Sequence, residues 1–113
     1  MPATYNLKDQ RVNDSFRGVR FRIKRQIDGQ PVDLSSATGI TAKFKGGYDN
    51  KVLKTLTLGS GITMNDSLGG DFSLDPFIIT MPNGVYKYDV QIDFPGNIKT
   101  TYIEGTVDIK PDL

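Results

Sequence analysis

The sequence predicts an all-β fold, a single antiparallel β-sandwich domain over residues 1–113 with roughly seven to nine short strands. Apolar residues recur at every second position through most of the chain, a period typical of half-buried strands. Turn-forming pairs such as Asn83-Gly84 and Pro95-Gly96 interrupt these runs at short intervals. No window combines a helical repeat with capping residues, which leaves strands as the regular structure of the chain.

The first half of the chain predicts three strands. Residues 19–25 read VRFRIKR, in which apolar side chains alternate with basic ones. Residues 40–45, ITAKFK, repeat this pattern and end at Gly46-Gly47. Residues 55–58, TLTL, alternate threonine with leucine. Each strand therefore has one face for the core and one for solvent, as strands of antiparallel sheets commonly do.

The second half predicts the remaining strands. Residues 62–64 and 72–74 are short alternating runs on either side of the glycine pair at 69–70. The longest alternation is residues 86–94, YKYDVQIDF, and residues 100–109 follow it. Gly105, inside this last strand, indicates a bulge or a close backbone approach. We expect loose ends at residues 1–4 and 111–113.

The composition excludes many kinds of chemistry. The 113 residues contain no cysteine, histidine or tryptophan, and Glu104 is the single glutamate. Thiol nucleophiles, disulfides and imidazole bases or ligands are therefore absent. The oxygen-rich turn at 65–71 lacks the ligand spacing of a calcium loop, and its residue types are common in turns. We expect no enzymatic activity, no catalytic residue, no metal site and no cofactor.

The sequence also predicts no interaction with a membrane. No apolar run approaches the ~18 residues of a spanning helix. The N-terminal residues lack the charged start and apolar core of a secretory signal. We therefore expect a chain that is made in soluble form.

The segment MPNGVYKYDV, residues 81–90, predicts a tyrosine corner. In immunoglobulin-like sandwiches, a tyrosine near the start of strand F bonds back to the preceding corner, and a cysteine follows two residues later. Gly84 would make the turn, Tyr86 would be the corner tyrosine, and Tyr88 would fill the space of that cysteine. The alternative is a pair of half-buried tyrosines on an ordinary strand. The corner favours an immunoglobulin-like sandwich.

The order of several segments resembles a group of small phage virion proteins, the N-terminal domains of baseplate upper proteins and related immunoglobulin-like tail or head modules. The segments are QPVDLSSA (30–37) leading into ITAKF (40–44), GITM (61–64), GDFSL (70–74), MPNGVYKYDV (81–90) and YIEGTV (102–107). The resemblance implies a sandwich that docks to neighbouring virion subunits, and it carries over no catalytic residue. Since baseplate upper proteins continue into a larger C-terminal region, it also implies that this chain is the docking or decorating module alone.

The net charge of +1 combines two halves of opposite sign. Residues 1–60 hold eleven Lys and Arg and five Asp, whereas residues 61–113 hold three Lys and eight Asp and Glu. In an immunoglobulin-like topology, strand 19–25 belongs to one sheet and strands 86–94 and 100–109 to the other. We therefore predict two opposed candidate interaction faces, one basic (Arg20, Arg22, Lys24) and one acidic (Asp89, Asp93, Glu104, Asp108).

Three hypotheses of function follow. The first is a non-enzymatic structural protein of a phage virion, in the tail, the baseplate or as a capsid decoration, whose partners are other virion proteins and copies of itself. The second is a carbohydrate- or receptor-binding sandwich, with Tyr5, Tyr48 and Tyr102 available to stack on sugar rings. The third is a nucleic-acid-binding β domain, which is disfavoured because Phe21 faces the core and cannot stack on bases.

Overall fold

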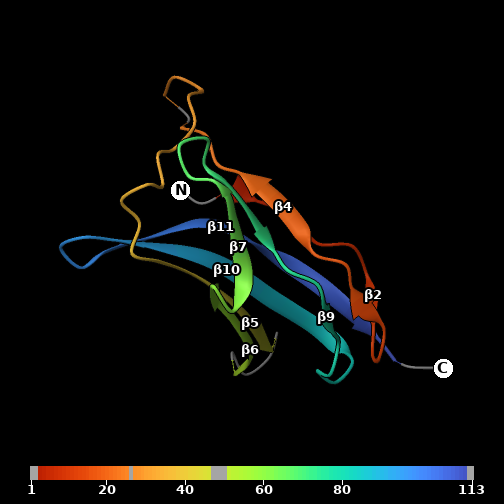
Figure 1. Ribbon diagram of the computed structural model, residues 1–113. Coiled ribbons are helices and arrows are strands. Elements are labelled where there is room, and N and C mark those ends of the chain that lie inside the picture. The colour runs from red at the N-terminus through yellow and green to blue at the C-terminus, as the bar shows by residue number, and fades with distance from the viewer. Residues whose placement is uncertain (1–2, 26, 47–50, 112–113) are drawn as a thin grey trace.

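The computed structural model describes residues 3–25, 27–46 and 51–111, and in these residues the regular structure is all strand (Figure 1). The strands are β1 (Ala3–Thr4), β2 (Gln10–Arg11), β3 (Ser15–Phe16), β4 (Val19–Arg22), β5 (Gly39–Gly46), β6 (Val52–Leu58), β7 (Gly61–Asp66), β8 (Asp71–Leu74), β9 (Phe77–Ile78), β10 (Gly84–Phe94) and β11 (Ile98–Lys110). The prediction of an all-β chain is confirmed.

The strands form a sandwich with an immunoglobulin-like neighbour order. One path of pairings runs β1-β11-β10-β5-β6-β7-β8-β4, and β3 pairs with β9 in a separate two-stranded sheet. The triplets β5-β10-β11 and β4-β8-β7 correspond to the C-F-G and B-E-D groups of an immunoglobulin-like sandwich. β4 therefore belongs to one layer and β10 and β11 to the other, as the sequence predicts.

The prediction of a strictly antiparallel fold is wrong. β1 and β2 both pair with β11 in parallel, and β6 pairs in parallel with β7 over two residues. Between β1 and β2, the N–H of Tyr5 donates to the carbonyl of Glu104, and the N–H of Leu7 to that of Thr106, both at 2.9 Å. The N-terminal segment, residues 3–12, therefore runs beside β11 in the same direction.

This pairing also corrects the predicted loose N-terminus. Ala3 and Thr4 lie opposite Ile103 and Glu104 in a ladder, so they belong to the sheet. Pro111 is exposed and outside any strand, although its carbonyl accepts a hydrogen bond of 2.9 Å from Arg11 Nη1. Residues 1, 2, 112 and 113 of the predicted loose ends lie outside the described residues.

The core lies between the two layers and is built from the alternating apolar positions. The largest fully buried side chains are Tyr88, Phe44, Phe72, Leu34, Ile40, Ile62, Leu74, Ile79, Ile92, Ile109 and Val90. Tyr88 and Phe44, on adjacent strands, stack with ring centroids 5.8 Å apart. Burying such apolar side chains, aliphatic and aromatic, supplies most of the driving force for folding in a chain without disulfides.

The hairpin of β10 and β11 is the longest element of the fold, and its tip extends beyond the other strands (Figure 1). Gly96 and Asn97 at the tip have positive φ angles, which glycine and asparagine tolerate. The ladder has one irregularity, because Val90 faces Ile103 whereas Gln91 faces Thr101. Tyr102 is therefore the extra residue of a β-bulge.

Candidate interaction surfaces

The corner before β10 has the hydrogen bond that the tyrosine-corner motif predicts. The hydroxyl of Tyr86 donates to the carbonyl oxygen of Pro82 at 2.6 Å. Gly84 has a φ of 148°, a conformation that side chains rarely adopt, so glycine suits the turn into the strand. The bond ties the start of β10 to the preceding loop.

Tyr88 connects the core to the N-terminal segment. Its hydroxyl donates to the carbonyl oxygen of Tyr5, and burial raises its pKa. Gly105 lies opposite Tyr88 in the ladder, where a Cβ would come within 2.7 Å of the carbonyl carbon of Tyr5. The predicted close backbone approach at Gly105 is confirmed, and the bulge lies at Tyr102.

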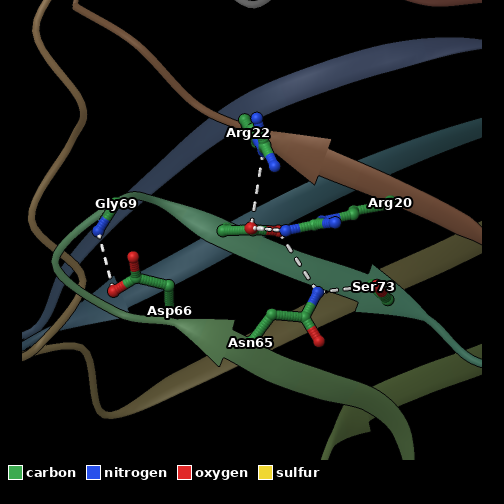
Figure 2. A network of polar contacts seen from close by, with 7 residues as sticks. Arg20, Arg22, Asn65, Asp66, Gly69 and Ser73 are labelled. Carbon is green, nitrogen blue, oxygen red and sulfur yellow. Dashed lines mark hydrogen bonds and ion pairs between the residues drawn. The ribbon is translucent and has the colours of Figure 1, made fainter.

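A buried carboxylate lies within the predicted basic face, in the polar network to which Arg20, Arg22, Asn65 and Ser73 belong (Figure 2). Asp71, at the start of β8, is 4% exposed and lies opposite Arg22 in the ladder. Arg20 donates to both of its carboxylate oxygens, with Nε at 2.8 Å from Oδ1, and Arg22 Nε lies 3.5 Å from Oδ2. Asn65 donates to Oδ1 of Asp71 at 3.2 Å and to the hydroxyl of Ser73 at 2.8 Å. Two arginines of the predicted face are thus held by one acid.

This arrangement changes the electrostatics of the basic face. The hydrogen bond from Arg20 holds the pKa of Asp71 well below its usual range, and the same bond raises the pKa of Arg20. The predicted basic face is therefore partly neutralised, because β8 brings a carboxylate between the arginines. Lys24 has no ion-pair partner among the described residues.

The predicted acidic face is also of mixed sign. Asp89 lies opposite Lys43 of β5, and its carboxylate is 3.4 Å from the ammonium of Lys45. Asp108 is paired with Lys110 at 2.8 Å. Asp93 faces Lys99 across the hairpin, and Glu104 is an exposed neighbour of Asp89. The prediction fails because β5, from the basic half of the sequence, pairs directly with β10 and places its lysines on the same surface.

A groove that the sequence did not predict lies where the two edges of the sheet path approach each other. It has a volume of about 480 Å³. β1 and β4 are the two terminal strands of the path, and residues of both line the groove. The lining residues are Ala3, Thr4, Tyr5, Phe21, Arg22, Ile23, Lys24, Arg25, Val32, Tyr102 and Ile103. We call this feature the edge groove.

The edge groove brings together two of the three tyrosines considered for sugar stacking. Tyr5 is 49% exposed, and its ring packs edge-on against Phe21 with centroids 5.6 Å apart. Tyr102 lines the same groove together with its chain neighbour Ile103. In a regular strand two successive side chains would point to opposite faces, and the bulge at Tyr102 lifts this constraint. Tyr48 lies outside the described residues.

The rim of the edge groove is basic. Arg22, Lys24 and Arg25 line it, and the described lining residues include no carboxylate. Arg25 is paired with Asp28 at 2.6 Å, and Arg22 shares Asp71 with Arg20. Lys24 therefore contributes the charge that is not balanced by a neighbouring acid among the described residues.

Neither a metal-binding cluster nor a membrane-spanning helix is present among the described residues. Within residues 3–25, 27–46 and 51–111, no group of three or more acidic side chains could hold a metal ion. In the same ranges, no helix is long and apolar enough to cross a membrane.

Comparisons with known proteins identify no family for this chain. No family model matches the chain, and no curated protein matches it. Among solved structures, CopC from Methylosinus trichosporium OB3b is similar, with a TM-score of 0.46 and 17% sequence identity over 93% of this chain and 88% of that one.

Proposed function

We propose that this chain is a non-enzymatic structural module of a phage virion, located in the tail, the baseplate or at the head surface. It docks to neighbouring virion proteins and to copies of itself. The phage assignment rests on the order of the resembling segments, which contribute to β5, β7, β8, β10 and β11 of the sandwich. The observation that carries the docking role is the edge groove, which combines an apolar floor, a basic rim and two sheet edges.

The charged outer faces are weaker candidates for docking. Several of their arginines, lysines and carboxylates are paired within the chain, as with Arg20 and Asp71 or Lys45 and Asp89. Exposed ion pairs contribute only about 0–1 kcal/mol each. Affinity would therefore come from apolar contacts in the edge groove and from many copies that act together in a particle.

A carbohydrate- or receptor-binding module is the alternative that a specific observation favours. Tyr5 and Tyr102 lie in one groove beside basic side chains, and exposed aromatic rings suit the apolar faces of sugars. Binding to nucleic acid is less favoured, because Arg20 and Arg22 are engaged by Asp71.

The test is the presence of the chain in purified particles. Particles of the phage that encodes it are purified on a density gradient, and the chain is quantified by mass spectrometry against the major capsid protein. We expect a fixed ratio of the two proteins across the particle peak. A chain that is abundant in the lysate but absent from the particles would refute the virion role. A glycan array, probed with wild type and Tyr5→Ala, tests the carbohydrate-binding alternative.

A further inference from the structure

We propose that the edge groove binds an extended, acidic peptide segment of a partner protein, which adds to the sheet beside β4. This inference takes its biological setting from the proposed docking function and specifies the partner's chemistry.

The shape of the edge groove matches an extended chain. Consecutive residues line it on both sides, Ala3–Tyr5 on one and Phe21–Arg25 on the other. Since side chains in a strand alternate between faces, a run of consecutive lining residues means that each strand presents its edge. β4 pairs with β8 on one side, and among the described strands none pairs with its second edge. Unpaired backbone groups on such an edge are the template for an added strand.

The floor of the edge groove favours apolar side chains at alternate positions of the added strand. Phe21, Ile23 and Ile103 are buried core residues whose surfaces reach the groove, and Tyr5 and Tyr102 widen this apolar surface. A strand that lies over them would turn every second side chain toward the floor. The alternate side chains would point outward to the rim.

The rim selects the charge of those outward side chains. Arg22, Lys24 and Arg25 line the groove without a lining carboxylate among the described residues, and Lys24 has no ion-pair partner there. Complementary charges set partner choice and the rate of encounter more than affinity. An acidic segment is therefore preferred over a neutral or basic one. A saccharide could use the aromatic floor, but it has no backbone amides to pair with the edge of β4.

The test uses a fluorescein-labelled peptide of four glutamate-valine repeats, with a lysine-valine peptide and a hexaglutamate peptide as controls. Binding to the full chain is measured by fluorescence anisotropy. We expect the glutamate-valine peptide to bind at least about fivefold more tightly than either control. Lys24→Glu should weaken it by about fivefold, whereas Lys99→Glu, which makes the same charge change on the hairpin, should leave it within about twofold.

NMR spectra then test the binding mode. Amides of β1 and β4 should shift and gain protection from hydrogen exchange, whereas those of the central strand β10 should not. Equal loss of affinity in the two lysine variants, shifts confined to other strands, or displacement of the peptide by 3′-sialyllactose would overturn the inference. If the chain is found in particles and the peptide nevertheless does not bind, the inference fails alone. If the peptide binds but the chain is absent from particles, the virion role fails alone.

Discussion

Replacing Gly105 by alanine tests the close packing of the N-terminal segment on β11. The added Cβ would lie 2.7 Å from the carbonyl carbon of Tyr5 and nearer still to its oxygen, and 3.0 Å from the Tyr88 ring. Both Tyr5 atoms belong to the backbone, so no side-chain rotation relieves the overlap. Since Gly105 is not among the glycines with positive φ, alanine fits its backbone conformation and the overlap is the dominant effect.

The magnitude follows from the contacts that must separate. If the segment around Tyr5 moves off β11, the chain loses the bonds from Tyr5 N to Glu104 O and from Leu7 N to Thr106 O. It also loses the bond from the Tyr88 hydroxyl to the carbonyl of Tyr5. Three hydrogen bonds at about 1 kcal/mol each amount to a destabilisation of about 3 kcal/mol. For a domain of this size, the expected decrease is about 10–15 °C in the melting temperature and about 2 M in the urea midpoint.

Urea and thermal denaturation, followed by circular dichroism, measure this loss. Gly39→Ala in β5 is the matched control, because its Cβ would make one ordinary contact, at 3.6 Å from Asp93 Oδ2. We expect the control to stay within about 0.5 kcal/mol of wild type. If Gly105→Ala were as stable as Gly39→Ala, the described packing of residues 3–12 against β11 would be wrong.

Two further predictions concern single hydrogen-bonded groups. Tyr86→Phe removes the hydroxyl bond to Pro82 and should lower the free energy of unfolding by about 1 kcal/mol. Tyr102→Phe is the control, because the hydroxyl of Tyr102 has no hydrogen bond among the described residues, and it should leave this free energy nearly unchanged. Equal urea midpoints for the two variants would argue against the corner bond. For Asp71, whose pKa is depressed by Arg20, the stabilisation is present above the unfolded pKa of about 3.9 and is lost as the pH falls toward the folded value. The gap in urea midpoint between wild type and Asp71→Asn should therefore be larger at pH 6 than at pH 3, and a constant gap would contradict the pairing.

The strands of the core were predictable because their side chains alternate. The runs at 40–45 and 86–94 lie within β5 and β10, and Tyr86 makes the predicted bond. β1 and β2 were missed because the short alternation of Ala3, Tyr5 and Leu7 ends in the polar run KDQR at residues 8–11. Their parallel pairing with β11 joins positions about a hundred residues apart, which no local pattern records.

The surfaces were harder to predict, because they depend on which strands become neighbours. Charges were assigned to faces from the halves of the sequence, yet Lys45 of the basic half lies beside Asp89 of the acidic half. Asp71 reaches the arginines only through the register of β4 and β8. The edge groove depends in addition on the one-residue bulge at Tyr102, whose position follows from the ladder and not from the residue itself. These features arise from pairing, so alternation alone could not reveal them.

The parallel contact between the N-terminal segment and β11 determines how the module would respond to mechanical force. The segment starts opposite Ile103 and ends opposite Lys110, so the two ends of the described chain leave this contact in opposite directions (Figure 1). A pull that separates them would slide one strand along the other and load the hydrogen bonds of Tyr5, Leu7 and Val12 together. Bonds strained in shear share the force, whereas bonds opened from one end break in turn. The rate of forced unfolding depends on the barrier to breaking these bonds together, so this contact would act as a mechanical clamp.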